Sequence, residues 1–597
     1  MPPCAVRITC VSSERRVRAV LPLLRPQAGR WVALGVLTAV GAGLTVVGPL
    51  VVREIVDRAV DGTDAATIRR LAIVFLLIVV TAQVVAVLVA RSATYTAWRT
   101  TNELRMRMSR HVLGLDHEFH RRHTPGELIQ RVDGDITSVS DLLGRVLPKA
   151  AGSAILVGGM IVVVTVIDWR IGAGMFVYVV LAVAAVLVLR HRAVEESADE
   201  LGAYARLYGG IEERLNASED LRSNGAGSHA MWRFVEDSAG ALDRSVRRES
   251  AFLGMWWGVQ GAVVGGVVLS VVAGAVLVSR DAITVGTAFL LFQYVLLIQR
   301  PLEEVVHELE TVQKATGAMR RVLALMAVEP TLLDRGTTSP VAGPLSVEFA
   351  RVSFDYGDDD PVLHDVDLSI GAGRSVGIVG RTGSGKTTFS RLVLRLVEAT
   401  DGSVRLGDVR IADIPMRELR RRVALVPQEV ELFNGTIRDN VTLFDPVPSD
   451  DAVLAALRSV GLDALANAGI DRPLGGGGAG LSAGEAQLLA MARVWLRDPD
   501  LVVLDEATAR VDPATERRIE SAMRELMHGR TTLVIAHRLS TLAEVDDIVV
   551  FEQGRIVEAG PRTELASDPD GRFRRLLDLA LEPDAGARRS AAEGLLA

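Results

Sequence analysis

The sequence has 597 residues, a length that suggests three or four domains, and its mean hydropathy of +0.28 is high for a soluble protein of this size. Its two cysteines, Cys4 and Cys10, both lie near the N-terminus, which excludes a disulfide framework and a cysteine-based zinc site. The formal net charge of −7 provides no basic surface for nucleic acid, so we expect no nucleic-acid partner.

The first half contains six windows of mostly apolar residues, each close to the ~20 residues that a membrane helix needs. They are 31–52, 71–90, 150–167, 171–190, 252–278 and 283–299. The first window follows several arginines, as a signal peptide would, but its apolar run is too long for one and no clean cleavage site follows it. We therefore expect a six-helix α-helical transmembrane domain at 31–325, preceded by a cytoplasmic tail at 1–30.

The connections between these windows alternate between short and long. The two long ones are 91–149, which is rich in arginine, and 191–251. Excess arginine marks the cytoplasmic side, so we expect both termini and both long connections to be cytoplasmic, with the windows in a bacterial plasma membrane. Apolar residues at helical spacing predict that the membrane helices continue into these connections, and Pro125 and Gly126 predict a turn near one tip.

Three histidines near that tip, His117, His120 and His123, raise the question of a metal cluster. No fourth ligand lies nearby, and their spacing drifts off one face of a helix. A solvated or docking surface is therefore the favoured interpretation.

The windows carry no ionisable residue well inside them, whereas ion-coupled transporters usually need such groups at mid-membrane. The energy for transport must then come from another part of the chain. Several polar and aromatic side chains could line a cavity for a small amphiphilic substrate, although packing is the stronger interpretation for each one singly. They are Gln83, Tyr178, Trp256, Trp257, Gln260, Gln293 and Tyr294. Gly261 and Gly265, at GxxxG spacing, predict a close approach of helices.

From about residue 344 the pattern changes to short β-branched strands typical of an α/β domain. An apolar strand there leads into a glycine-rich loop and then a helix. The loop residues are Gly380, Arg381, Thr382, Gly383, Ser384, Gly385, Lys386, Thr387 and Thr388. Glycines let backbone N–H groups converge on phosphates, Lys386 supplies a positive charge and the Thr387 hydroxyl is suited to bind Mg²⁺. We expect this P-loop to bind ATP and Mg²⁺.

Other strand ends carry the remaining groups that ATP hydrolysis needs. A buried strand ends in Asp505, placed to hold Mg²⁺, and Glu506, placed as general base for the attacking water. His537 ends another buried strand and suits the γ-phosphate, while Gln428 follows a third and can reach the metal and the water. Tyr356 can stack on adenine.

In order and spacing, the P-loop, Gln428, the segment "LSAGE" at 481–485, "LDEAT" at 504–508 and His537 resemble the ATPase of ABC transporters. With six membrane helices ahead of it, the chain resembles a half-size ABC exporter over about 15–580. The resemblance implies an α/β P-loop ABC ATPase domain at 344–582. The composition predicts a polar linker before it at 326–343 and a loose tail after it at 583–597. The resemblance also implies that tips near 116–128 and 207–220 are coupling helices that dock on the ATPases.

The same resemblance implies a dimer in which two ATPase domains close over two ATP molecules. Ser482 and Gly484 would then reach the ATP on the partner's P-loop, and Asp512 would link the two sites. The family's usual first glycine and glutamine in the segment 481–485 are here Ala483 and Glu485. Ala483 adds a Cβ where the backbone is expected to approach closely or to adopt an unusual conformation. Glu485 puts a carboxylate near an anion, so a heterodimer with a second half-transporter is favoured over a homodimer.

The expected function is ATP-driven export of a hydrophobic or amphiphilic substrate by alternating access. An importer on the same fold remains an alternative, disfavoured because the first window begins by residue 31 and leaves no room for an extra N-terminal domain. An ATP-gated channel or sensor also remains, disfavoured by the presence of Glu506.

Overall fold

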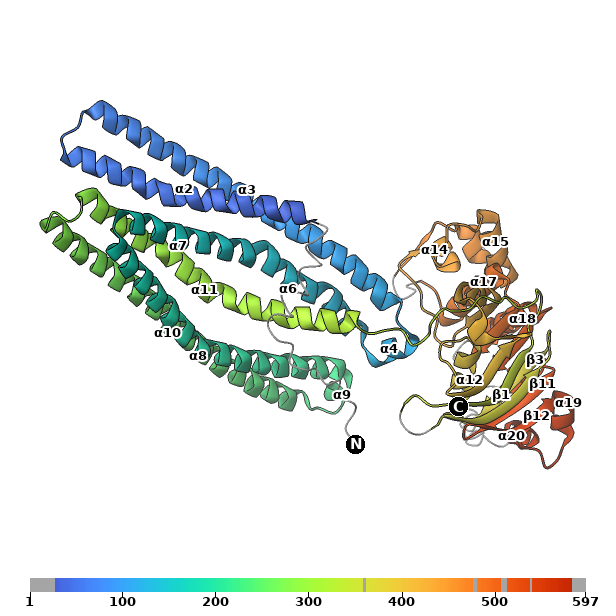
Figure 1. The fold of residues 1–597 in the computed structure, drawn as a ribbon. Coiled ribbons are helices and arrows are strands. Elements are labelled where there is room, and N and C mark those ends of the chain that lie inside the picture. Colours follow the sequence, from blue (N-terminus) through green and yellow to red (C-terminus); the bar gives the residue numbers. More distant parts are fainter. Residues whose placement is uncertain (1–26, 358–360, 476–479, 506–512, 537–538, 582–597) are drawn as a thin grey trace. The chain divides into compact units, whose positions relative to one another are not determined.

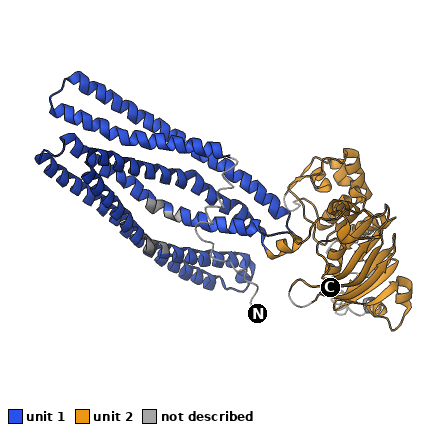
Figure 2. Cartoon of the chain, in the orientation of Figure 1, with its two compact units in different colours: residues 1–115, 123–329 blue, residues 116–122, 330–597 orange. Residues whose placement is uncertain are grey.

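The computed structural model describes residues 27–357, 361–475, 480–505, 513–536 and 539–581. The chain divides into two compact units. Unit 1 comprises the chain up to Leu115 together with His123–Glu329, and unit 2 comprises Asp116–Arg122 together with the chain from Pro330 onward (Figure 2). A short segment from the first half of the sequence therefore belongs with the second unit.

Unit 1 is entirely helical in its described residues. Its long helices are α2 (Ala28–Val60), α3 (Ala65–Leu113), α7 (Leu147–Ile167), α8 (Trp169–Asn216), α10 (Gly227–Ser279) and α11 (Val285–Met326). Its shorter elements are α5 (Pro125–Ile129), the π-helical turn η2 (Gln130–Asp135), α6 (Ile136–Asp141), the π-helical turn η3 (Leu142–Val146) and α9 (Ser218–Ser223). Six helices of the described chain are long and apolar enough to cross a membrane, which confirms the six windows.

The long helices associate as pairs of chain neighbours. In Figure 1, α2 runs beside α3, and α8 runs beside α10 with α9 at the turn between them. The helix α11 contacts α2, α7 and α10, so it links the two pairs. Its buried Tyr294 donates a hydrogen bond of 3.0 Å to the carbonyl of Val46 on α2.

One carboxylate joins α2 to the first turn of α11. Asp57 accepts the N–H of Gly286 at 2.7 Å through Oδ1 and the hydroxyl of Thr284 at 2.9 Å through Oδ2. A Cβ on Gly286 would lie 2.4 Å from the carbonyl oxygen of Arg53, so only glycine allows this approach. Asp57 thus caps a helix to which it does not belong, and a negative charge there also suits the helix dipole.

The two glycines singled out in the sequence do not have the role expected of them, whereas the packing interpretation favoured for Tyr178 is confirmed. A Cβ on Gly261 or Gly265 would meet no described atom within 4 Å, so within this chain neither marks a close approach of helices. The close approach is at Gly266 instead, where a Cβ would lie 2.4 Å from the Tyr178 hydroxyl. Tyr178 donates a hydrogen bond of 3.1 Å to the Ala262 carbonyl and is therefore a packing residue between α8 and α10.

Unit 2 is an α/β structure with two principal sheets. The order β12-β11-β3-β10-β9-β6 forms the larger sheet, and β2-β1-β4-β5 forms the smaller antiparallel one. The larger sheet consists of β12 (Arg555–Pro561), β11 (Asp547–Glu552), β3 (Ser375–Gly380), β10 (Thr531–Ile535), β9 (Leu501–Asp505) and β6 (Val423–Val426). The smaller consists of β2 (Leu363–Ile370), β1 (Val347–Phe354), β4 (Asp401–Leu406) and β5 (Val409–Arg410). A third, two-stranded sheet consists of β7 (Gly435–Thr436) and β8 (Pro473–Leu474).

Helices surround these sheets and complete the unit. They are α4 (His117–Arg122), α12 (Lys386–Val393), α13 (Met416–Arg422), α14 (Ile437–Thr442), α15 (Asp450–Ser459), α16 (Asp463–Ala468), α17 (Ala483–Arg497), α18 (Pro513–Met527), α19 (Arg562–Ser567) and α20 (Arg572–Leu581), with 3₁₀ turns η4 (Ile411–Asp413) and η6 (Leu539–Leu542). Strands β3, β9 and β10 are buried almost throughout, as expected for parallel strands covered on both faces. An α-helical membrane region followed by an α/β domain is the predicted fold class, and it is confirmed.

Candidate nucleotide-binding site

The P-loop follows β3 and opens α12, as the sequence predicts. Gly380, Gly383 and Gly385 have φ values of 155°, 79° and 105°, which favour glycine. A Cβ on Gly380 would lie 2.3 Å from the carbonyl oxygen of Phe551, and one on Gly385 would lie 2.6 Å from Leu363. Backbone conformation therefore requires all three glycines, and close neighbours also require Gly380 and Gly385.

The N-terminus of α12 is arranged as an anion site. Among the described residues, no side chain caps this helix, whose N-cap is Gly385. The buried Lys386 donates hydrogen bonds to the carbonyls of Gly380 and, at 3.1 Å, Arg381. The buried hydroxyl oxygen of Ser384 has no hydrogen-bond partner within the described structure. Uncapped amides, a lysine held over the loop and an orphaned hydroxyl all fit a bound phosphate group.

The remaining loop residues lie around this end of the helix. Arg381, Thr382 and Thr387 are exposed, whereas Thr388 is buried. The Thr387 hydroxyl group is thus open to solvent at the first turn of α12, where a Mg²⁺ ligand would be needed.

Sheet topology brings two further candidates to the same edge. Strands β3, β10, β9 and β6 are parallel neighbours, so their carboxyl ends lie together. Asp505 ends β9, and Gln428 follows β6, whose Val426 is paired with Leu504. Carboxyl ends of parallel strands are where ligands bind in open α/β sheets. Glu506, Asp512 and His537 lie outside the described residues.

A contact that the sequence did not suggest joins α17 to the Gln428 region. Gln487, on α17, is buried and its Nε2 donates a hydrogen bond of 3.2 Å to the carbonyl of Pro427. The segment that carries Gln428 is therefore tied to the helix that Ser482 begins. In the sequence, this contact is marked by nothing more than a glutamine among the apolar residues of the helix.

Ser482 and Glu485 form a capping box at the N-terminus of α17. The Ser482 hydroxyl accepts the Glu485 N–H at 3.2 Å, and Glu485 Oε2 accepts the Ser482 N–H at 2.9 Å and lies 3.1 Å from the Ser482 hydroxyl. Gly484 is buried in the first turn. Ala483 is the first helical residue and has no positive φ, so the expectation of an unusual backbone conformation there is wrong.

Tyr356, the residue expected to stack on adenine, is held against α12. Its hydroxyl accepts a hydrogen bond of 2.9 Å from Arg391 and lies 3.2 Å from the Thr388 hydroxyl, so it is fixed to α12. The guanidinium carbon of Arg121, on α4, lies 4.9 Å from the centre of the Tyr356 ring. The ring predicted to stack on adenine thus already carries a cation in this structure.

The tip expected at 116–128 is divided between the two units. Asp116–Arg122 belongs to unit 2, whereas the chain from His123 belongs to unit 1. Within unit 2, Asp116 Oδ2 accepts a hydrogen bond of 2.8 Å from the Thr331 hydroxyl. The described residues contain no group of three metal-binding side chains. The other tip is the end of α8 and α9, and it belongs to unit 1.

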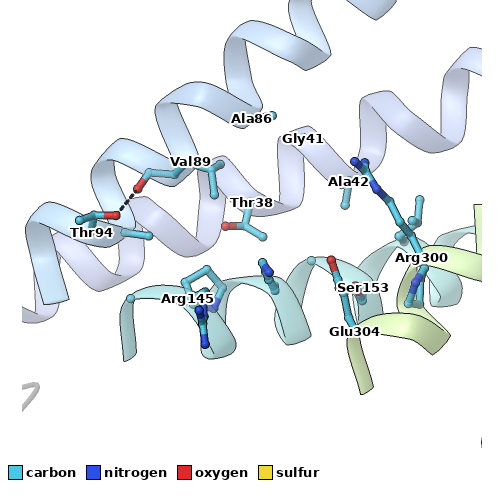
Figure 3. A pocket seen from close by; sticks show the side chains of 18 of the residues that line it. Thr38, Gly41, Ala42, Ala86, Val89, Thr94, Arg145, Ser153, Arg300 and Glu304 are labelled. Atoms are coloured by element: carbon cyan, nitrogen blue, oxygen red, sulfur yellow. Dashed lines mark hydrogen bonds between the residues drawn. The ribbon is translucent and has the colours of Figure 1, made fainter. Parts of the chain in front are cut away.

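Unit 1 contains a cavity of about 590 Å³ between α2, α3, α7 and α11 (Figure 3). Small side chains form much of its wall, among them Gly41, Ala42 and Ala86. Charged groups also line it, including Arg145, Lys149, Arg300 and Glu304, and Glu304 accepts a hydrogen bond of 2.6 Å from Ser153. None of the polar and aromatic residues listed from the sequence lines this cavity, because small rather than bulky side chains leave the space.

Comparison with known proteins covers both units. Residues 31–302 match the family model of the ABC transporter transmembrane region, and residues 363–509 match the ABC transporter model. An ATP-dependent lipid A-core flippase of Pseudomonas fluorescens is 30% identical over 500 residues, 81% of each chain. A fatty acid ABC transporter ATP-binding/permease protein of Mycobacterium bovis is 30% identical over 529 residues, 85% of this chain and 80% of that one.

The solved structure of a bacterial Atm1-family ABC exporter with ATP bound aligns with a TM-score of 0.79 at 26% identity, covering 94% of this chain and 99% of the other. These matches extend over the membrane helices, the P-loop and the parallel sheet together. The chain therefore belongs to the ABC transporter family, as a multi-pass half-size exporter whose fused ATPase domain drives export of its substrate.

Proposed function

We propose that Mg²⁺ and ATP bind at the N-terminus of α12 and that the strand ends hydrolyse the nucleotide. Lys386 and the P-loop amides hold the phosphates, while Thr387, Gln428 and Asp505 hold the metal. Glu506 acts as general base, His537 contacts the γ-phosphate and Tyr356 contacts the adenine. The observation that carries this proposal is the uncapped helix N-terminus beside Lys386 and the unpartnered Ser384 hydroxyl.

The substrate is a lipid-like amphiphile that enters the cavity of unit 1. Small apolar side chains accommodate a hydrocarbon chain, and Arg145, Lys149 and Arg300 lie where a polar or anionic head group would be. The names of the flippase and of the fatty acid transporter agree with this class.

Filling the cavity tests the substrate proposal. In proteoliposomes, a panel of lipids, fatty acids and drugs would be screened for stimulation of ATP hydrolysis. Ala86→Phe should reduce stimulation by the best compound, because the ring would occupy the cavity. Val84→Phe is the matched control, since Val84 is 54% exposed on the same helix. Equal stimulation of the wild type and Ala86→Phe would exclude this cavity as the substrate site.

Both termini and the ATPase domain face the cytoplasm of a bacterial cell. The arginine-rich connection between α3 and α7 supports this orientation. A single cysteine in place of Asp61, in the turn between α2 and α3, should react with a membrane-impermeant maleimide in intact cells. A cysteine in place of Glu219 on α9 should react only after lysis.

The chain functions as one half of a heterodimer. Its own P-loop is complete, but its α17 presents the carboxylate of Glu485 where the partner's nucleotide would lie. Purified alone, the chain should show little ATPase activity. With its partner, one ATP per complex should turn over while the other stays trapped. Robust substrate-stimulated hydrolysis by a purified homodimer, with two equivalent sites, would contradict this proposal and favour the homodimer.

A further inference from the structure

The helix α4 holds two guanidinium groups in fixed positions. Glu118 accepts two hydrogen bonds of 2.8 Å from Arg121 and one of 2.9 Å from Arg122. Both arginines are thereby ordered at the surface of unit 2. Because this order is maintained within α4 itself, the helix presents a prearranged pair of cations to its neighbour.

That neighbour is Tyr356. Arg121 lies over the ring at 4.9 Å from its centre, and Arg122 donates a hydrogen bond of 2.9 Å to the Tyr356 carbonyl. Phe354 packs against the same ring at 4.7 Å between centroids and with an interplanar angle of 88°. Through its hydroxyl, the tyrosine also reaches Thr388 and Arg391 on α12. Tyr356 thus connects α4 to the P-loop helix.

Stacking on adenine requires a free face of the Tyr356 ring, and a cation over the ring occupies such a face. This argument rests on the proposed adenine-binding role of Tyr356. We propose that Arg121 is a positioning residue that competes with adenine for the Tyr356 ring. ATP binding then replaces the Arg121 contact, while the Arg122 bond to the Tyr356 carbonyl keeps α4 on unit 2. The nucleotide thereby changes the contacts that hold α4: the Arg121 contact is lost and the Arg122 hydrogen bond remains.

The alternative is that Arg121 attracts the triphosphate by charge alone. Its charge is already balanced by Glu118, with which it forms two hydrogen bonds. The two explanations predict opposite changes in the affinity for ATP when Arg121 is removed. If Arg121 competes with the base, its removal strengthens ATP binding, whereas if it attracts phosphate, its removal weakens binding.

The test measures binding of a nonhydrolysable ATP analogue and of inorganic tripolyphosphate to the full chain in nanodiscs. An exposed cation–π contact implies that Arg121→Ala tightens binding of the ATP analogue about two- to five-fold. Tripolyphosphate, which has no base, should bind Arg121→Ala and the wild type equally. Arg572→Ala is the matched control, since it removes an exposed arginine of the same unit from its ion pair with Glu552.

Weaker binding of the ATP analogue to Arg121→Ala, or an equal change for both probes, would overturn the competition. Arg121→Gln gives the same measurement if the alanine variant is unstable. Tyr356→Leu separates the two proposals. If it leaves binding of the ATP analogue unchanged, the adenine role of Tyr356 itself fails. If it weakens that binding, the gain from Arg121→Ala should disappear in the double variant, because the competition needs the ring.

Discussion

Two helices in unit 2 begin in opposite ways, although both are expected to face a phosphate. The helix α12 begins at a glycine with φ of 105° and has no side-chain cap among the described residues. The helix α17 begins at Ser482, and the Glu485 carboxylate already accepts the Ser482 N–H. One N-terminus thus leaves its amides available to an anion, whereas the other contains an anion of its own.

This difference shows that a helix N-terminus can bind an external anion only when the helix's own side chains do not already occupy it. The first four N–H groups of any helix lack partners within the helix. A capping box supplies such partners, and its carboxylate also opposes a second negative charge nearby. Under the proposed assignment, the P-loop offers free amides to the chain's own nucleotide, whereas the segment 481–485 presents a carboxylate to a partner's nucleotide.

The largest expected effect concerns the chemistry beside the open helix. Glu506→Gln should retain ATP binding and lower turnover by ~10²–10⁴-fold, because general-base assistance is lost. Lys386→Ala should instead weaken nucleotide binding itself, since this lysine is held over the loop by the Gly380 and Arg381 carbonyls. Binding and ATPase assays of the purified complex distinguish the two variants. Near wild-type hydrolysis by Glu506→Gln would remove Glu506 from its proposed role.

Much of this architecture follows from sequence pattern alone. Apolar run length predicted the membrane helices, because a bilayer imposes a length on any helix that crosses it. The P-loop was predictable because the local backbone conformation requires its glycines, as the φ values of 79° at Gly383 and 105° at Gly385 show. By contrast, the Arg121–Tyr356 and Asp57–Gly286 contacts join residues more than two hundred positions apart. Such pairs depend on tertiary packing, which no local pattern encodes.

The cavity of unit 1 was missed for a related reason. The sequence search looked for polar and aromatic side chains, but space between helices is left by the residues that are small. Alanines and glycines are common in membrane helices, so their presence does not mark a cavity until the helices are placed.

A second prediction removes the charge from the closed helix. Glu485→Gln keeps a side chain that can complete a capping box, so the start of α17 should be preserved. The carboxylate at ~8 Å from a phosphate charge costs about 2 kcal/mol at an effective dielectric of ~20. At the site that α17 completes, the variant should therefore bind ATP more tightly and hydrolyse it faster. The ATPase activity of the assembled transporter measures this gain.

The chain offers a matched control for this substitution. Thr436 and Asp439 form a second capping box, at the start of α14. Asp439→Asn removes the charge from that box but leaves the segment 481–485 untouched. If Asp439→Asn raises ATPase activity as much as Glu485→Gln does, the effect comes from net charge and not from the N-terminus of α17.

At the N-terminus of a third helix, α11, a carboxylate from α2 has a structural role, because Asp57 connects the two helices. Asp57→Ala should lower stability by about 1 kcal/mol, a typical cost for losing a helix cap. Thermal unfolding of the full chain followed by tryptophan fluorescence measures the loss. Glu54→Ala is the control, since Glu54 forms only an exposed ion pair with Arg58. Equal melting temperatures for Asp57→Ala and the wild type would show that the tie contributes nothing.

The smallest expected effect separates the two departures within the segment 481–485. Ala483 is exposed and already helical, so its Cβ imposes no backbone strain. Ala483→Gly should therefore lower stability by less than the roughly 1 kcal/mol that glycine costs in a helix interior, because the position lies in the first turn, and should leave ATPase activity close to that of the wild type. The same ATPase assay used for Glu485→Gln measures both variants side by side. A larger gain from Ala483→Gly than from Glu485→Gln would mean that the methyl group blocks the approach of the partner's nucleotide, and that the carboxylate is not what distinguishes α17 from α12.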